Sequence, residues 1–288
     1  MLADAFPQHA ALVISTLRLV QPLGKPTAML GQGVGPLSDP SLCRLARIVL
    51  PRLRIITLRE GRAGPGLLSS FGVPSERIIV TGDDAIEFAY ENRRPDLTRG
   101  IGFNLRLAPY SDVIQGEADG ISRVIRRVAE QEKVPLIGIP ISRNATEDDA
   151  ETLVRQLDIS AHEAQALRRL DNPLDVIRQV GRCSVVVTGS YHAGVFAMAQ
   201  GISVVGLAKS SYYADKFNGL AEQFGEGCTV LRLDADDLLE RFQSTVSLAL
   251  KRAEYCRAQL LQAAAKEIRL GREAYANVLR VPSIMEAA

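Results

Sequence analysis

Residues 185–217 constrain the fold of this chain more than any other stretch of its sequence. They run VVVTGSYHAGVFAMAQGISVVGLAKSSYYADKF, which is an apolar segment, a polar turn, a helix of small residues and a second apolar segment. Two short buried strands joined by a helix predict a parallel pair in an open α/β sheet. Such sheets bind ligands at the carboxyl ends of their strands. We therefore expect the side chains that follow the strands to form the functional site.

The same alternation of strand and helix runs along most of the chain. Expected strands occupy residues 27–30, 53–58, 77–80, 100–105, 135–139, 185–187, 203–207 and 229–233. The polar segment 91–99 contains a proline and is typical of a linker between domains. We predict a first domain at residues 1–94, a second at residues 95–262, and a C-terminal helix at residues 263–288 that packs back on the first domain. Strand-end turns of both domains would then face a shared cleft.

Composition excludes several classes of function. The net charge of +1 over 288 residues provides no broad field for nucleic acid. The four cysteines are scattered without a C-x-x-C pair, which indicates neither a disulfide framework nor a zinc site. Apolar runs are too short for a membrane-spanning helix, which needs about 18 residues or more. We expect a cytoplasmic protein that binds no metal or nucleic acid and contacts a membrane at most at its surface.

A glycine-rich turn follows the first expected strand. It contains Gly31, Gln32, Gly33 and Gly35, in the spacing G-x-G-x-G. This spacing matches neither the dinucleotide-binding fingerprint nor the P-loop. One interpretation is a tight turn in which glycine adopts positive φ. The alternative is a loop whose amides hold a phosphate at the start of the next helix.

His192 is the candidate catalytic acid or base. It follows Ser190 and Tyr191 in a turn at a strand end, and it opens a helix. Histidine changes charge near neutral pH, which suits it to proton transfer. His9 and His162 fall in expected surface helices, where we expect them to be solvated.

Basic side chains follow several of the expected strands. These residues are Arg59, Arg106, Arg143, Lys209 and Lys216. If their turns converge, they would neutralise a carboxylate or phosphate ligand. Each one alone is equally well explained by a surface ion pair. Asn104 shares the turn of Arg106, and Asp83 begins a helix after another strand, either as a helix cap or as a cleft residue.

Several stretches resemble the polysaccharide pyruvyl transferase family. They are GQGVGPL at 31–37, ITLRE at 56–60, VTGDD at 80–84, SYH at 190–192, GISVVG at 201–206 and KF at 216–217. Their order and spacing carry the resemblance, which covers most of residues 20–225. It implies two facing Rossmann-like domains, as in the GT-B glycosyltransferases. Family members usually begin with a further strand and turn, so we expect the N-terminal domain to be incomplete.

The resemblance also implies an activity. Characterised members transfer a pyruvyl group from phosphoenolpyruvate to a sugar of a surface polysaccharide, which forms a cyclic ketal. The implied partners are phosphoenolpyruvate, a glycan or lipid-linked oligosaccharide acceptor, and envelope-biosynthesis machinery at the inner face of the membrane. No cofactor or metal is implied. In the family an Arg-x-His turn helps to hold the donor; here His192 matches the histidine, and Ser190 stands where the arginine often stands.

The expected site follows from this resemblance together with the strand-end pattern. The candidates are His192 as the catalytic residue, Arg59, Arg106, Ser190, Tyr191, Lys209 and Lys216 for the donor, Gly31, Gln32, Gly33 and Gly35 as a phosphate or cleft loop, and Asp83, Asn104 and Arg143 elsewhere in the cleft. Two other functions fit the same residues. One is a nucleotide-sugar glycosyltransferase of similar architecture. The other is a non-catalytic member that binds glycans or joins a biosynthetic complex.

Overall fold

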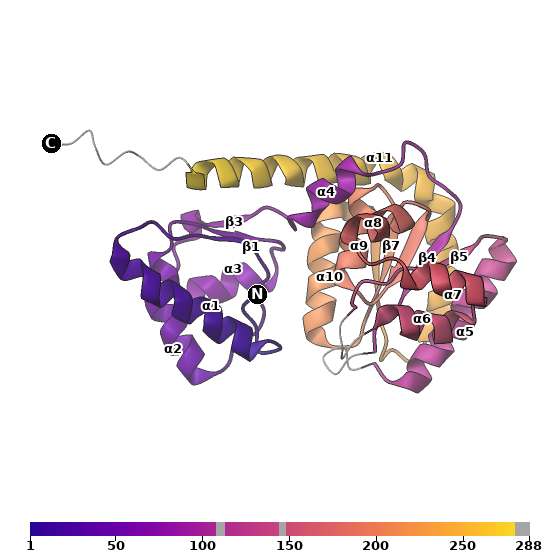
Figure 1. Ribbon diagram of the computed structural model, residues 1–288, viewed down its shortest axis with the longest axis horizontal. Helices are drawn as coiled ribbons and strands as arrows, with labels where there is room; N and C mark the ends of the chain where they lie inside the picture. Colours follow the sequence, from indigo (N-terminus) through magenta and orange to yellow (C-terminus); the bar gives the residue numbers. More distant parts are fainter. Residues whose placement is uncertain (108–112, 144–147, 280–288) are drawn as a thin grey trace. The chain divides into compact units, whose positions relative to one another are not determined.

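The computed structural model describes residues 1–107, 113–143 and 148–279 (Figure 1). Its contacts divide the chain into two compact units. Unit 1 comprises Met1–Asp84 together with the chain from Lys266 onward, and unit 2 comprises Ala85–Ala265. Residues 280–288 of the predicted C-terminal segment lie outside the described residues. Among the helices that are described, none has the length and hydropathy needed to cross a bilayer.

The segment that the sequence predicts as a linker, residues 91–99, belongs to unit 2. Helix α4 (Ala85–Glu91) packs against α9 (Tyr191–Ala199). The Arg257 guanidinium donates hydrogen bonds to the carbonyls of Arg94 at 2.8 Å and Pro95 at 3.0 Å. The boundary between the two units, after Asp84, therefore lies earlier in the chain than the domain boundary after residue 94 that composition suggested.

Unit 1 is built on a parallel sheet in the order β1-β2-β3. Its elements are α1 (Pro7–Val20), η1 (Gln21–Leu23), β1 (Met29–Gln32), α2 (Pro40–Val49), η2 (Leu50–Arg52), β2 (Ile56–Leu58), α3 (Ala63–Ser70), η3 (Ser75–Arg77) and β3 (Ile78–Val80). Asp39 caps α2 by accepting from the amides of Ser41 and Leu42, and Pro40 occupies the first turn. The core of the unit gathers apolar side chains of α1, α2, α3 and the strands.

Unit 2 is built on a second parallel sheet, in the order β5-β4-β6-β7-β8. Besides α4 and α9, its elements are β4 (Ile101–Asn104), α5 (Gln115–Glu132), β5 (Leu136–Gly138), α6 (Asp149–Leu157), α7 (Ala161–Arg168), α8 (Pro173–Val180), β6 (Val185–Thr188), β7 (Ser203–Ala208), α10 (Ser211–Phe224), η5 (Gly225–Gly227), β8 (Cys228–Arg232) and α11 (Leu238–Leu279), whose last part belongs to unit 1. Every residue of β4, β6 and β7 is buried.

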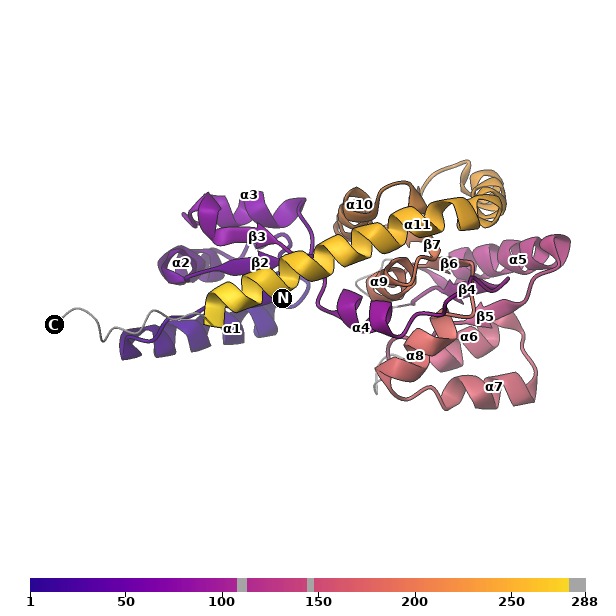
Figure 2. The same ribbon diagram turned by 90° about the horizontal axis from the view of Figure 1, so that it is seen from above.

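Helices lie on both faces of the unit 2 sheet (Figure 2). On one face, Phe103, Val187 and Val205 share a core with α5 and the first part of α11. On the other face, Gly194 of α9 lies close to Val204, because a Cβ at Gly194 would be 3.7 Å from the Val204 side chain. Burial on both faces explains why the strands read as continuous apolar runs.

The strand order places a topological switch point between β4 and β6. The chain leaves β4 for β5 on one side and returns to β6 on the other side, where Asn104 pairs with Thr188 in parallel register. Ligands of doubly wound sheets bind outside the carboxyl ends of the two strands at such a point. The turns that follow Asn104 and Thr188 therefore lie where a ligand is expected.

Candidate functional site

The glycine-rich turn of unit 1 packs against charged side chains from the neighbouring strand ends. A Cβ on Gly31 would overlap the Asp84 carboxylate, and Gly31 has a φ of +61°. A Cβ on Gly33 would lie 2.6 Å from Nε of Arg59. The Arg59 guanidinium is itself 3.8 Å from Asp83. Four residues predicted as site residues, Gly31, Gly33, Arg59 and Asp83, thus meet at the carboxyl edge of this sheet.

Two amides of the same turn are already used within the protein. The Gly31 amide donates to Oγ1 of Thr57 at 2.7 Å, and the Gly35 amide donates to the carbonyl of Leu2 at 2.9 Å. The Gln32 side-chain amide donates to a backbone carbonyl two residues before it, at 2.9 Å. These contacts favour the tight-turn interpretation over a loop that offers its amides to a phosphate.

Replacing Gly33 with alanine should displace the Arg59 guanidinium. The added methyl group would contact a side chain that is 8% exposed, so we expect a loss of about 1–3 kcal/mol in the free energy of unfolding. Gly66→Ala is the matched control, because a Cβ there meets nothing within 4 Å and the residue lies in α3. Alanine in a helix should stabilise by about 0.5–1 kcal/mol. Urea unfolding of both variants checks this, and equal stabilities would contradict the packing described.

Asp84 forms a hydrogen bond with the last part of α11. The Tyr275 hydroxyl donates to Oδ2 of Asp84 at 2.8 Å. Burial raises the pKa of Asp84; the Tyr275 hydrogen bond opposes this rise, and the adjacent Asp83 adds to it. Burial and the same hydrogen bond raise the pKa of Tyr275 to about 12. Tyr275 therefore stays protonated at neutral pH and holds the Asp84 side chain beside Gly31.

Asp84→Asn should have a pH-dependent effect on stability. A carboxyl whose pKa is higher in the folded chain than in the unfolded chain binds protons more tightly when folded, so its ionisation destabilises the fold as pH rises through the folded pKa. We expect Asp84→Asn to be more stable than the natural chain at pH 7, and the difference to shrink as pH falls. Urea unfolding across pH measures this. The control Gly66→Ala changes no ionisable group and should differ from the natural chain by the same amount at every pH, and a pH-independent difference for Asp84→Asn would contradict the assignment.

The turn after β6 lies directly against the segment that follows β4. Its backbone is fixed by Thr188, whose Oγ1 accepts from the Ser190 amide at 2.8 Å and donates to the Ser190 carbonyl at 3.2 Å. The Gly189 amide donates to the Asn104 carbonyl at 2.9 Å, and a Cβ on Gly189 would lie 3.8 Å from the amide nitrogen of Arg106. The structure thus brings Ser190, Asn104 and Arg106 together at the switch point.

His192 lies on the first turn of α9, with its side chain exposed. Its ring meets the Tyr191 ring edge-on at 5.7 Å between centroids and lies 6.4 Å from Phe196. Ser190 and Tyr191 are buried. Within the described residues, the Ser190 side chain makes no capping hydrogen bond to α9. The positive end of the helix dipole is therefore directed to this edge, beside an accessible imidazole.

A buried carboxylate orients the Arg106 side chain. Asp149, at the start of α6, accepts from Nε of Arg106 at 3.3 Å and from its Nη2 at 3.1 Å. Oδ2 of Asp149 also accepts from the Asn104 amide and from the backbone amides of Ile141 and Ser142, each at 2.9 Å. Paired charge-assisted hydrogen bonds fix the plane of a guanidinium. The strand-end turns of β4 and β5 are therefore joined through Asp149.

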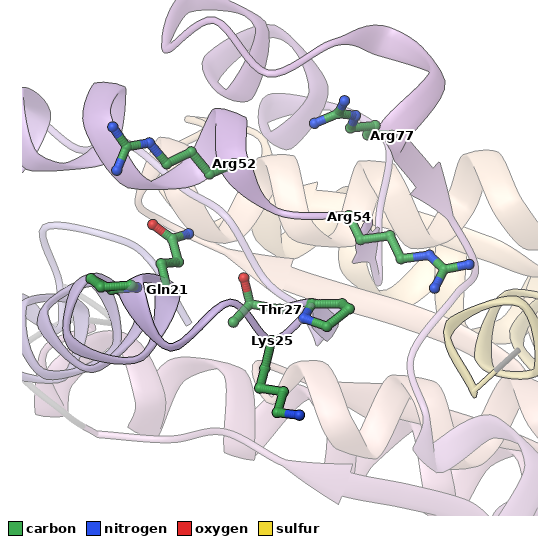
Figure 3. Close-up of a pocket in the computed structure, with 8 residues that line it drawn as sticks. Gln21, Lys25, Thr27, Arg52, Arg54 and Arg77 are labelled. Atoms are coloured by element: carbon green, nitrogen blue, oxygen red, sulfur yellow. The ribbon is translucent and has the colours of Figure 1, made fainter. Parts of the chain in front are cut away.

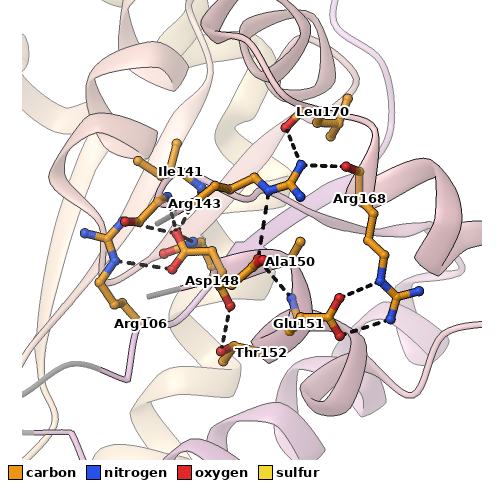
Figure 4. Close-up of polar contacts among 12 residues, drawn as sticks. Arg106, Ile141, Arg143, Asp148, Ala150, Glu151, Thr152, Arg168 and Leu170 are labelled. Atoms are coloured by element: carbon orange, nitrogen blue, oxygen red, sulfur yellow. Dashed lines mark hydrogen bonds and ion pairs between the residues drawn. The ribbon is translucent and has the colours of Figure 1, made fainter. Parts of the chain in front are cut away.

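Arg143 points away from Arg106, toward the end of α7 (Figure 4). Its guanidinium donates to the carbonyls of Arg168 and Leu170, the latter at 3.4 Å, and it lies 4.0 Å from Asp148. Cations at a helix C-terminus stabilise the unsatisfied carbonyls there. This arrangement gives Arg143 a structural role at α7.

Two predicted lysines are engaged by other side chains of unit 2. Lys209 forms an ion pair with Glu117, at 2.8 Å. Lys216 is buried, with its Nζ 3.9 Å from the ring centre of Tyr212 and 4.8 Å from that of Tyr213. Such contacts stabilise a desolvated cation. The part of the chain that the structure describes contains no cluster of three or more histidine, cysteine or acidic side chains suited to a metal ion.

Two residues of these edges escape prediction from the sequence. In the sequence Asp149 resembles an ordinary helix-start acid, and its hydrogen bonds with Arg106 are what show that it reaches the Arg106 turn. Tyr275 is distant in sequence from Asp84, and no local pattern marks it. A polar cluster following a strand-end turn, as at residues 148–149, is the one signal that could have suggested Asp149.

Comparisons with known proteins agree with the fold. A model of the polysaccharide pyruvyl transferase family matches residues 3–211. No curated protein matches the sequence. Solved structures that resemble the chain include Anabaena HepE in complex with UDP, 12% identical, with a TM-score of 0.58 over 94% of this chain and 77% of that one. UDP-GlcNAc 2-epimerase from Neisseria meningitidis bound to UDP-GlcNAc is 12% identical, with a TM-score of 0.58 over 93% and 73% of the two chains.

MurG from Acinetobacter baumannii is 11% identical, with a TM-score of 0.53 over 96% of this chain and 79% of that one. Identities this low show the fold alone. The three structural matches confirm the predicted GT-B-like α/β class with parallel sheets.

Proposed function

Because the chain belongs to the polysaccharide pyruvyl transferase family, we propose that it transfers a pyruvyl group from phosphoenolpyruvate to a sugar of a glycan. The observation that carries the proposal is the position of His192. Its imidazole is exposed on the first turn of α9, beside the switch point between β4 and β6. A proton-transfer group is thus available where a doubly wound sheet binds its ligand.

The surroundings suit a donor that carries a carboxylate and a phosphate. The amino end of α9 favours negative charge through its dipole and its amides. Arg106 adds a guanidinium whose orientation is fixed by Asp149. Ser190 stands where the family's Arg-x-His pattern has its arginine, so a small buried hydroxyl residue takes the place of that cation. We propose that the amino end of α9 supplies the positive potential at this edge, and that Arg106, held in place by Asp149, contributes hydrogen-bond donors.

The reaction balances with one proton transfer to carbon. A proton added to the methylene carbon of phosphoenolpyruvate makes a methyl group and leaves C2 electrophilic. Two acceptor hydroxyl oxygens form bonds to C2, and the bond from C2 to the phosphate oxygen breaks. One of the two hydroxyl protons replaces the proton delivered to carbon, and the other leaves with phosphate. His192 would deliver or accept these protons, a role that typically contributes about 10²–10⁴-fold in rate.

Ligand stabilisation separates this function from the alternatives. Phosphoenolpyruvate should raise the melting temperature, since a ligand that binds only the folded state stabilises it. UDP-GlcNAc should have little effect. The opposite pattern would favour a nucleotide-sugar glycosyltransferase. Stabilisation by an oligosaccharide alone would favour a non-catalytic glycan-binding protein.

A further inference from the structure

Leucine side chains are exposed along α1 and the turn that follows it. The exposed fractions are 66% for Leu12, 76% for Leu19 and 71% for Leu23. Leu12 and Leu19 are seven residues apart, which places them on one face of the helix. Ala10 and Ile14, on the opposite face, are buried. Helix α1 therefore has an apolar strip on its solvent side in addition to the apolar side that packs into unit 1.

The neighbouring helix extends this exposed apolar surface. Helices α1 and α2 pack against each other and lie side by side in unit 1 (Figure 2). Ile48 of α2 is exposed, on the side of the helix away from the buried Ala46. Within residues 1–84, every large hydrophobic side chain that is exposed belongs to α1, η1 or α2. We call the solvent-facing side of these three elements the outer surface of unit 1.

The charge near the outer surface has one sign. Residues 5–52 contain five lysine and arginine residues and one acidic residue, although the whole chain has a net charge of only +1. That acid, Asp39, caps α2, and the preceding acid, Asp4, accepts from the Ser38 amide. The five basic side chains are exposed, and none of them forms an ion pair with a described residue; they are Arg18, Lys25, Arg44, Arg47 and Arg52.

These cations are spread out and do not enclose a single anion. The cationic ends of Lys25 and Arg52 point apart (Figure 3). Arg18 lies on α1, whereas Arg44 and Arg47 lie on α2. Separated cations of one sign suit a partner that presents many negative charges over an extended surface.

We propose that the outer surface of unit 1 binds an anionic phospholipid bilayer. Exposed leucines can enter the boundary between head groups and acyl chains, while lysine and arginine attract the anionic head groups. A nucleic acid would leave the leucines in water, and a second copy of this chain would bring like charges together. The proposal does not depend on pyruvyl transfer, because α1 and α2 belong to unit 1 and the His192 turn belongs to unit 2.

Sedimentation with lipid vesicles tests the proposal. The natural chain should sediment with vesicles of phosphatidylglycerol and phosphatidylcholine and bind at least tenfold more weakly to phosphatidylcholine alone. Added salt should release it, because salt screens exposed charges. Absence of binding to the mixed vesicles, or equal binding to the two compositions, would overturn the proposal.

The double variant Leu12→Gln with Leu19→Gln should weaken vesicle binding at least tenfold. Its matched control is Leu239→Gln with Leu248→Gln, which changes two exposed leucines of α11 in unit 2 and should bind as the natural chain does. Both variants should keep the melting temperature of the natural chain, since all four side chains are exposed. Equal weakening in the two variants would overturn the assignment to the outer surface.

Removal of charge provides an independent test. Lys25→Gln with Arg52→Gln should weaken binding to the mixed vesicles about tenfold and reduce its dependence on salt. The control, Arg123→Gln with Arg127→Gln, removes the same charge from exposed positions of α5 and should have no effect. Equal binding in the two charge variants would contradict the proposal. Sedimentation velocity tests the other occupant: a dimer of the natural chain that Leu12→Gln with Leu19→Gln dissociates would assign the surface to a second copy and overturn the bilayer assignment.

Discussion

Replacing His192 with alanine is expected to lower the turnover number by about 10²–10⁴-fold while leaving the protein folded. The imidazole is exposed on the first turn of α9, so its removal creates no buried cavity. If His192 transfers a proton in the rate-limiting step, the Michaelis constant for phosphoenolpyruvate should change far less than the turnover number. Steady-state kinetics with phosphoenolpyruvate and a glycan acceptor measure both.

His162→Ala provides the matched control for this variant. His162 is an exposed histidine of the same unit, on α7, away from the switch point between β4 and β6. It should retain full activity and stability. Similar activity in His192→Ala and His162→Ala would show that His192 takes no part in the reaction. The turn after β6 would then contain no identified catalytic group.

Asp149→Ala should destabilise unit 2 by about 3–5 kcal/mol. The carboxylate accepts hydrogen bonds from Arg106, Asn104 and two backbone amides, and it is 4% exposed. Alanine would leave the Arg106 guanidinium and three further donors without their acceptor in a buried place. That cost is a large share of the roughly 5–15 kcal/mol that stabilises a typical domain.

Glu151→Ala is the control for Asp149→Ala. Glu151 lies two residues further along α6 and pairs with Arg168 at the surface, where ion pairs contribute about 0–1 kcal/mol. The loss in free energy of unfolding for Asp149→Asn should fall between those of the two alanine variants, because asparagine keeps the shape of the side chain and loses its charge. Urea unfolding of the three variants tests the order. A loss for Asp149→Ala no larger than that for Glu151→Ala would contradict the network around Arg106.

The fold was predictable because its signals are local. Apolar runs of β-branched residues such as Val185, Val186 and Val187 predict buried parallel strands, and the structure has β6 there. The expected strands differ from those observed by a few residues at their ends, where hydrogen bonding rather than side-chain pattern decides the boundary. The expected linker at residues 91–99 rests on polarity, which marks exposure; in the structure the contacts of Arg257 with Arg94 and Pro95 hold this polar segment to unit 2.

The site was predictable only in part, because strand-end position does not determine where a long side chain points. Arg59 and Arg106 remain at the edges of their sheets, each beside a carboxylate. Arg143 turns to the end of α7, and Lys209 turns to Glu117. Arg143 and Lys209 do follow strands, as the sequence predicts. Their partners, however, lie on segments that are distant in the sequence. Partners of this kind become visible only once the chain is folded.

Transfer of labelled pyruvyl groups tests the central claim most directly. The protein is incubated with phosphoenolpyruvate carrying carbon-13 in its three-carbon unit, together with a panel of glycan acceptors, and the products are followed by mass spectrometry alongside phosphate release. We predict that one acceptor gains a labelled pyruvyl ketal in a one-to-one ratio with released phosphate, and that His192→Ala abolishes both signals. Release of phosphate without label on any glycan, or transfer that is equal in His192→Ala, would contradict the account.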